Sequence, residues 1–146
     1  MNKQTVGIPI TLKFVTEIHD GPRKETIAFE TNGLYYEKGL TTYVTFQEPN
    51  EQGEVRTILK IKQEEVSITR QGVVSMRQSH KKGHLTNGTY VSQLGSFSLQ
   101  TKTDNVQFEW SEKNRRGQLF LTYALQIEES NAGRYAITIT FKEETK

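Results

Sequence analysis

Residues 67–84, SITRQGVVSMRQSHKKGH, hold most of the side chains of this sequence that could do chemistry together. The stretch carries four basic side chains and two of the three histidines, and it contains no carboxylate. Such a set could hold an anion, offer an imidazole as a general base, or form the solvated face of a β-hairpin. The choice depends on which of these side chains point the same way, and the strands that carry them determine this.

Apolar and polar residues alternate along most of the chain, which is typical of half-buried β-strands. The first segment places apolar side chains on one face at Val6, Ile8, Ile10, Leu12, Phe14 and Ile18. This row is longer than an ordinary strand, so we expect the strand to bend, near the out-of-phase Val15. Later inward rows are predicted at Ile27 and Phe29, Leu34 and Tyr36, Val44 and Phe46, Val55 to Ile61, Val66 and Ile68, Val74 and Met76, Tyr90, Phe97 and Leu99, Val106 to Trp110, Leu119 to Ile127, and Tyr135 to Phe141.

Turn-forming residues separate these rows. They are Asp20-Gly21-Pro22, Asn32-Gly33, Pro49-Asn50, Gln71-Gly72, Asn87-Gly88, Asp104-Asn105, and residues 114–117 and 131–133. We read Asn87-Gly88 as a turn although Asn87-Gly88-Thr89 also matches a glycosylation acceptor. No segment keeps a helical period with a cap, so little or no helix is expected.

The pattern predicts one all-β domain over residues 1–146, built from about ten antiparallel strands in a meander. Closing such a sheet into a barrel of about eight to ten strands removes its two unpaired edges. The interior of such a barrel suits one small ligand. A two-sheet sandwich stays open as an alternative, because periodicity does not report closure.

Register in the basic stretch can be argued from its apolar residues. A three-residue loop at residues 70–72, with the glycine in a left-handed conformation, pairs Ile68 with Val74 and Val66 with Met76. All four apolar side chains then share one face. A two-residue loop divides them between both faces, so we prefer the longer loop.

This register sorts the polar side chains of the hairpin. Gln78 and His80 continue the inward row, whereas Arg70 lies at the hairpin tip and Arg77 faces water. Residues 81–84 leave the strand as a loop. Most of the basic stretch is therefore expected to be solvated.

Five segments of the chain, PITLKF, TNGLYY, VRTILKI, TRQGVVSMRQ and GTYVSQLGSFSLQTKT, together resemble the YwiB-like family. These are small bacterial β-barrel proteins grouped with the calycins, the lipocalin-like superfamily. The resemblance spans nearly the whole chain and implies a cytoplasmic calycin-like barrel from a family with no established activity. It places the family's Arg-x-Gly turn on Arg70 and Gly72, its Met and Gln on Met76 and Gln78, and its aromatic before a glycine on Tyr90 and Gly95. Residues 92–94 read Ser-Gln-Leu where relatives often carry Thr-Pro.

A barrel of this kind suggests a small, partly apolar ligand in its lumen. Trp110 or the Tyr36 region would form an aromatic wall. The polar contacts would come from Gln78, His80 and Tyr90, with Arg70 at the rim. The alternative is that these side chains fill the barrel and pack on one another.

A basic surface offers a second function, the binding of nucleic acid or of an acidic protein. Residues 66–103 carry a charge of +5 and the rest of the chain −3. The side chains concerned are Arg70, Arg77, Lys81, Lys82 and Lys102. Phosphate binding by this set would weaken steeply with salt. Because the net charge is only +2 and the aromatic residues occupy inward positions, a solvated face is the competing interpretation.

Catalysis, metals and cofactors receive no support from the sequence. The chain has no cysteine, no Gly-x-Ser-x-Gly elbow, no P-loop and no dinucleotide fingerprint. His80 and His84 would share a face only on a helix, so no catalytic residue, metal ligand or cofactor is predicted. The first twenty residues alternate in polarity, and no apolar run approaches the ~20 residues that cross a bilayer. We therefore expect a cytoplasmic protein with no membrane partner, and the sequence leaves its oligomeric state open.

Overall fold

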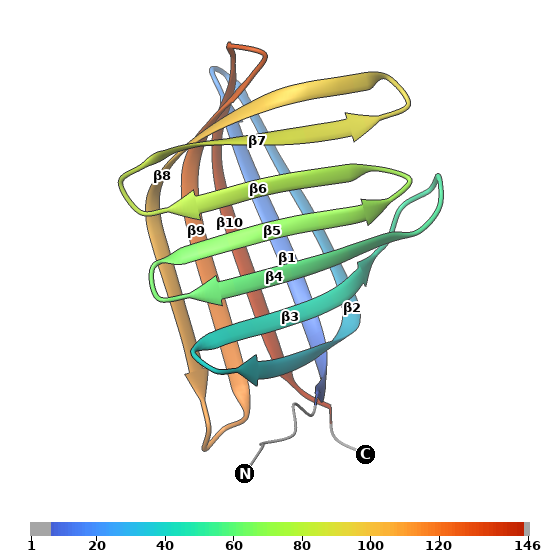
Figure 1. Ribbon diagram of the computed structural model, residues 1–146, viewed down its shortest axis with the longest axis vertical. Helices are drawn as coiled ribbons and strands as arrows, with labels where there is room; N and C mark the ends of the chain where they lie inside the picture. The colour runs from blue at the N-terminus through green and yellow to red at the C-terminus, as the bar shows by residue number, and fades with distance from the viewer. Residues whose placement is uncertain (1–6, 145–146) are drawn as a thin grey trace.

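The computed structural model describes residues 7–144, and its regular secondary structure consists of ten antiparallel strands. In chain order they are β1 (Ile8–Asp20), β2 (Arg23–Lys38), β3 (Thr41–Glu48), β4 (Val55–Lys62), β5 (Glu65–Gly72), β6 (Ser75–Lys81), β7 (Leu85–Ser92), β8 (Gly95–Ser111), β9 (Arg116–Ile127) and β10 (Ser130–Glu143). Each strand pairs with its sequence neighbours, and β1 also pairs with β10 (Figure 1). This ring confirms the all-β prediction and decides for the barrel over the sandwich. No helix capable of crossing a membrane occurs in residues 7–144.

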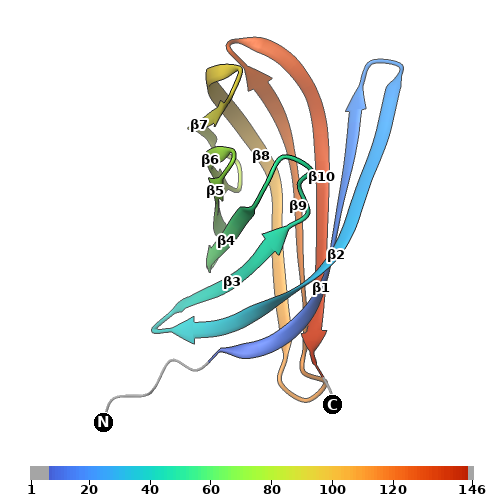
Figure 2. The ribbon, with the colours of Figure 1, turned by 90° about the vertical axis from the view of Figure 1, so that its right-hand side faces the viewer.

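The barrel is flattened into two layers whose strands cross steeply. The strands β8, β9, β10 and β1 run along the long axis, and β3 to β7 cross in front of them (Figure 1). Seen from the side, the two layers stand apart and enclose the interior (Figure 2). Alternate side chains of both layers fill this space, as the sequence period predicts. The apolar side chains that are fully shielded from solvent are Ile10, Val44, Leu59, Val66, Leu119, Leu121 and Ile139.

Four predicted turns lie in the interior of strands instead, and a fifth, Gln71-Gly72, forms the end of β5. Asn32-Gly33 falls within β2 and Asn87-Gly88 within β7, while Asp104-Asn105 and residues 131–133 form irregularities in β8 and β10. The predictions were wrong because long barrel strands must bend, and bulges and glycines permit this without ending the strand. A Cβ at Gly33 would lie 2.3 Å from the Thr45 carbonyl oxygen, and one at Gly88 would lie 2.2 Å from that of Arg77. Both glycines are therefore required by close approach of a neighbouring strand. The turn at Gly21-Pro22 and the loop at Pro49-Asn50 are confirmed.

The incorrect turn at Asn32-Gly33 also explains why Leu34 and Tyr36 were predicted to face inward. Because β2 continues through Asn32 and Gly33, its odd-numbered residues face inward along its whole length. Tyr35 is therefore buried, whereas Leu34, which was predicted to face inward, is 41% exposed. Tyr36 lies on the outside and stacks on Tyr43, with ring centroids 5.1 Å apart. Ile27 has the predicted phase but is exposed. It belongs to the β1–β2 hairpin, whose tip stands away from the barrel (Figure 2).

The predicted register of the β5–β6 hairpin is wrong. The observed partners are Arg70 with Met76, Ile68 with Gln78, and Val66 with His80. The cause is Gly72, which extends β5 and pairs with Val55 of β4 instead of closing a short loop. Arg70 consequently lies within the strand, not at the hairpin tip. The partner of Ile68 moves by four residues, an even number, so the predicted inward positions of Gln78 and His80 are unchanged.

Candidate functional site

A cavity of 420 Å³ lies inside the barrel, at the end where β9 turns into β10. Its lining residues are Arg70, Met76, Gln78, Tyr90, Phe97, Leu99, Tyr123, Leu125, Ile127 and Tyr135. The half-buried members Tyr90, Phe97, Ile127 and Tyr135 give it contact with solvent. Three of the four ligand-binding residues expected from the sequence, Arg70, Gln78 and Tyr90, thus meet around one space. Its volume is in the range of small-molecule sites.

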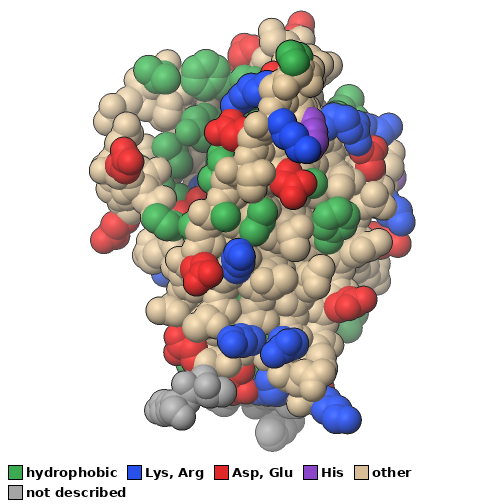
Figure 3. Space-filling model, turned by 180° about the vertical axis from the view of Figure 1, so that it is seen from behind, with side chains coloured by type: hydrophobic (Ala, Val, Ile, Leu, Met, Phe, Trp, Pro, Cys, Tyr) green, Lys and Arg blue, Asp and Glu red, His purple; other side chains and the backbone are tan. Residues whose placement is uncertain are grey.

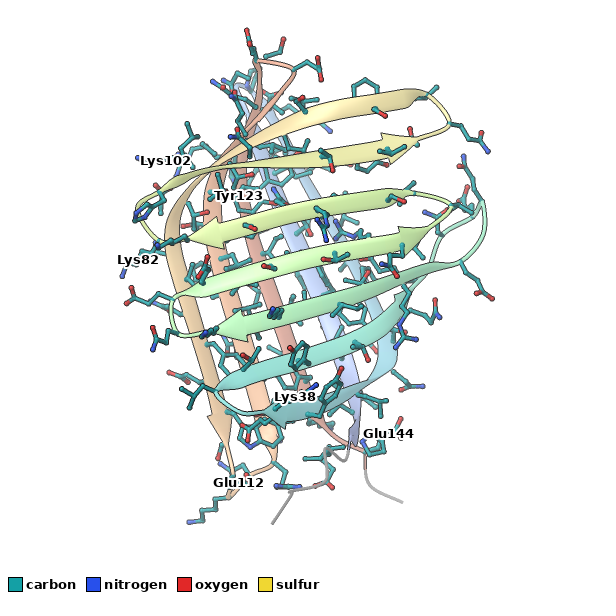
Figure 4. All side chains as sticks on the ribbon, in the orientation of Figure 1. Lys38, Lys82, Lys102, Glu112, Tyr123 and Glu144 are labelled. Atoms are coloured by element: carbon teal, nitrogen blue, oxygen red, sulfur yellow. The ribbon has the colours of Figure 1, made fainter. Side chains whose placement is uncertain are left out.

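Two tyrosines on the back layer form one wall of the cavity. Tyr123 of β9 and Tyr135 of β10 stack with ring centroids 5.2 Å apart and planes 10° apart. Figure 4 labels Tyr123, which lies inside the barrel. Burial raises the pKa of both tyrosines above the ordinary value, so their hydroxyls stay protonated. The sequence placed both residues in the core rows and missed them as site residues, although a phenol on an inward row is itself a signal for a polar contact.

Arg70 contributes the one charge among the residues that line the cavity. Its Nε donates to Glu48 Oε2 over 2.6 Å, and its Nη1 lies 3.0 Å from Met76 Sδ. Glu48 Oε2 also accepts a hydrogen bond of 2.5 Å from the fully buried Thr57 hydroxyl. The Arg70 and Glu48 side chains are only 20% and 15% exposed. This inward ion pair replaces the solvated tip position that the sequence analysis assigned to Arg70.

Gln78 of β6 lines the cavity, and His80 continues the same inward row away from it. Gln78 Nε2 donates to Thr101 Oγ1 over 3.0 Å, and His80 Nδ1 lies 3.2 Å from Thr103 Oγ1. The His80 ring is fully buried, with its centroid 4.5 Å from that of Tyr123, but it does not line the cavity. Burial, and then the positive charge of Arg70, lowers the pKa of His80 to about 4. His80 is therefore neutral near pH 7.

The His80 Nε2 atom is the single buried side-chain nitrogen or oxygen without a hydrogen-bond partner in the described part of the chain. Nδ1 contacts Thr103, so the imidazole is held at one nitrogen only. An unpaired polar atom in an apolar interior costs free energy. Protonation would place an N–H on both ring nitrogens, and the one on Nε2 would have no acceptor. This agrees with the lowered pKa of His80.

Gly88 makes the contacts between β6 and β8 possible. The strand β7 lies between them in the sheet, yet side chains of β6 bond to side chains of β8. Gly88 is the inward residue of β7 at this point and has no side chain to separate them. Further along, the Thr86 hydroxyl donates to the Ser79 carbonyl over 2.5 Å where the β6–β7 ladder has ended.

Aromatic rings pack on one another at the opposite end of the barrel. Tyr35 stacks on Trp110 with centroids 4.2 Å apart, and Phe141 packs against both rings. The Tyr35 hydroxyl donates to Glu37 over 2.9 Å. The aromatic wall that the sequence analysis placed on Trp110 or the Tyr36 region is thus far from the cavity: Trp110 closes the other end, and Tyr36 faces outward.

The predicted basic surface is mixed in charge. Lys82 and Lys102 lie on the same edge of the barrel (Figure 4). However, Glu65 is the cross-strand partner of Lys81, and the backbone of Lys82 bonds to that of Glu64. Charges that are separated along the sequence therefore meet again across β5 and β6. Figure 3 shows Lys and Arg interspersed with Asp and Glu on the side of the barrel behind Figure 1.

A wider hollow of 1350 Å³ lies mostly against the outer face of β1, β2 and β8 to β10. Its exposed side chains carry both signs, including Lys13 and Glu30, which are cross-strand partners. None of its charged lining residues is buried, and its apolar lining residues, Leu12, Phe108, Trp110 and Phe141, belong to the aromatic end of the barrel. Residues 7–144 contain no group of three His, Cys, Asp or Glu side chains placed to hold a metal ion.

Comparison with known proteins places this barrel among relatives of the same architecture. The chain is 31% identical over 134 residues to the uncharacterised β-barrel protein YwiB of Bacillus subtilis (strain 168), covering 92% of this chain and 93% of that protein. The crystal structure of YwiB from Bacillus subtilis superposes with a TM-score of 0.85 at 30% identity, over 95% of this chain and 94% of that one. The family described as a domain of unknown function, DUF1934, matches residues 12–139. The resemblance to the YwiB-like family that the sequence motifs indicate is thus confirmed, and the chain belongs to the DUF1934 family.

Proposed function

We propose that this protein is a non-catalytic binding protein that holds one small, largely apolar molecule in the 420 Å³ cavity. The observation that carries the proposal is the composition of that cavity. Aromatic and aliphatic side chains form most of its wall, and Arg70 and Gln78 contribute a guanidinium and an amide to it. An apolar wall with a few convergent polar groups is the usual character of a ligand site.

The two ends of the barrel support binding over simple packing. At one end the rings of Tyr35, Trp110 and Phe141 stack on one another, and the hollow that Trp110 and Phe141 border lies mostly against the polar outer face. At the other end, rings of similar size surround a space. A barrel that used its side chains only as filling would be expected to close both ends alike.

We also propose a cytoplasmic location, which the absence of cysteine supports.

Native mass spectrometry of the protein purified gently from its own host tests the proposal. A stoichiometric small mass that persists from low to moderate salt is expected. Nucleic acid or protein that leaves as the salt rises would support the basic surface instead. A bare chain that also fails to bind any small apolar probe would refute the proposal.

A cavity-filling variant gives the matched test. Leu99 is 5% exposed and lines the cavity, whereas Leu94, on the adjacent turn, is 88% exposed. The Leu99→Trp variant is expected to abolish retention of the small mass, and Leu94→Trp to leave it unchanged. Equal retention in both variants would place the ligand outside the cavity. The Gln78→Leu variant removes the amide and is expected to weaken binding without blocking the space.

A further inference from the structure

Arg70 has hydrogen-bond donors that the protein does not satisfy well. A guanidinium carries five N–H groups, and the structure gives Nε a carboxylate partner at 2.6 Å. Nη1, in contrast, has the Met76 thioether as its partner, and sulfur of this kind is a weak acceptor. Nη2 has no hydrogen-bond partner within residues 7–144. Nη2 is not among the buried atoms that lack a partner, so it is open to water or to an acceptor on a bound molecule.

Glu48 fixes the direction of the guanidinium. Its Oε2 receives both the Arg70 Nε and the Thr57 hydroxyl, so the carboxylate is itself held from the adjacent strand. With Nε occupied, the Nη1 and Nη2 atoms form the remaining edge of the planar group. That edge matches the two oxygens of a carboxylate in a bidentate pair.

The charge of Arg70 is felt inside the barrel. It opposes protonation of His80 and favours ionisation of Tyr123, in each case as the largest cause after burial. Glu48 offsets part of this charge, but it is not among the residues that line the cavity, and no other carboxylate lines it. A cationic ligand would therefore meet a field of its own sign, whereas an anionic one would be attracted.

From these contacts we infer that the cavity selects an apolar carboxylate, whose acid group pairs with the Nη1–Nη2 edge of Arg70 and whose body lies against the rings of Tyr90, Phe97 and Tyr135. The inference deepens the proposed function and rests on it. It also gives Glu48 a defined role: Glu48 positions Arg70, and its negative charge moderates the affinity for the acid.

Matched acid and alcohol probes test the inference by isothermal titration calorimetry at pH 7.5. Decanoate with decan-1-ol and 2-naphthoate with 2-naphthalenemethanol differ in the charged group but keep the body. The wild type is expected to bind each acid at least about tenfold more tightly than its alcohol, as a charge-assisted pair would give. Equal affinities, or a preference for the alcohols, would overturn the inference while leaving the binding function in place.

Two variants assign the preference to the ion pair. Glu48→Gln keeps an oxygen acceptor for Arg70 Nε and Thr57 but removes the negative charge, so it is expected to bind the acids several-fold more tightly. The double variant Glu48→Gln/Arg70→Gln leaves no unpaired charge in the interior, and it is expected to lose the preference while its affinity for the alcohols changes little. Arg77→Gln removes an exposed arginine and serves as the control.

The outcomes separate the two proposals. An acid preference that survives in the double variant overturns the inference. If no probe of either pair binds the wild type, the inference is overturned, and the binding function fails as well if the protein purified from its host carries no small mass. Thermal melting of each variant in the absence of probe confirms that it is folded.

Discussion

Lowering the pH toward 5 is expected to destabilise this protein through His80. The ring is fully buried, and burial together with the charge of Arg70 lowers its pKa from 6.5 to about 4. Between these two values the unfolded chain binds a proton that the folded protein excludes. The stability contributed by the neutral ring is therefore complete above pH 6.5 and is lost as the pH falls toward 4.

The size of the effect follows from the difference in proton binding. At pH 5 an unfolded-state pKa of 6.5 and a folded-state pKa of about 4 give a destabilisation of about 2 kcal/mol relative to pH 7.5. At pH 4 the loss grows to about 3 kcal/mol. For a chain of this size, 2 kcal/mol corresponds to a fall in the urea midpoint of about 1 M.

Urea unfolding at intervals between pH 7.5 and pH 4.5, in wild type and in His80→Asn, measures this contribution. Asn places an amide atom near the position of Nδ1, so the contact with Thr103 is kept while the titrating ring is removed. The variant is expected to be less stable at pH 7.5 but to lose about 2 kcal/mol less on going to pH 5. Carboxylates titrate in both proteins and cancel in the difference.

The matched control is His84→Asn, which removes an exposed histidine from the turn after β6. It is expected to retain the wild-type dependence on pH. Parallel curves for wild type and His80→Asn would show that His80 is not protonated more readily in the unfolded chain. The account of the buried, singly bonded imidazole would then be wrong.

Further predictions concern the strands that shape the barrel, and all are measured by urea unfolding at pH 7.5. Gly88→Ala is expected to cost about 2–4 kcal/mol, because its Cβ would collide with the Arg77 carbonyl oxygen, whereas Gly39→Ala, at φ 63° with no atom within 4 Å of its Cβ, is expected to cost about 1 kcal/mol. A loss for Gly88→Ala no larger than that for Gly39→Ala would contradict the close approach of β6 and β7. Leu119→Ala, at a fully buried site, is expected to cost about 2–5 kcal/mol, and Leu94→Ala less than about 0.5 kcal/mol. Thr57→Val is expected to cost about 1–2 kcal/mol, because Glu48 loses a buried donor; no loss would mean that Arg70 alone satisfies that carboxylate.

The inward rows could be read from the sequence because a strand has a period of two wherever one face is buried. The rows of β9 and β10 are observed as predicted, from Leu119 to Ile127 and from Tyr135 to Phe141. What failed was the local reading of glycine. Asn32-Gly33 and Asn87-Gly88 have the composition of hairpin turns, but their role is to admit a neighbouring backbone, and only the closed barrel shows which neighbour that is.

The candidate site was partly predictable for a related reason. Gln78 was placed correctly, because facing depends on parity and survives an even error in register. Arg70 was assigned to the hairpin tip, because the predicted register made residues 70–72 a three-residue loop. Its actual partners, Glu48 and Met76, lie 22 and 6 residues away in sequence. Pairings of this kind depend on the order and stagger of strands around the barrel, which local patterns do not contain.

The cavity itself follows from how the ten strands distribute bulk along the barrel. A ring of ten strands is wider than an eight-stranded one, whose interior side chains just fill it. At the Trp110 end the extra width is taken up by stacked aromatic rings. Toward the other end, β7 has Gly88 two residues before the cavity-lining Tyr90. Nearby, Gln78 of β6 and Thr101 of β8 bond to each other rather than reaching across the barrel. The space left there is bounded by aromatic and aliphatic side chains and by the Arg70 guanidinium, whose Nη1 and Nη2 atoms lack strong acceptors. Gly88, which admits the neighbouring backbone at β7, thus also leaves room for a ligand.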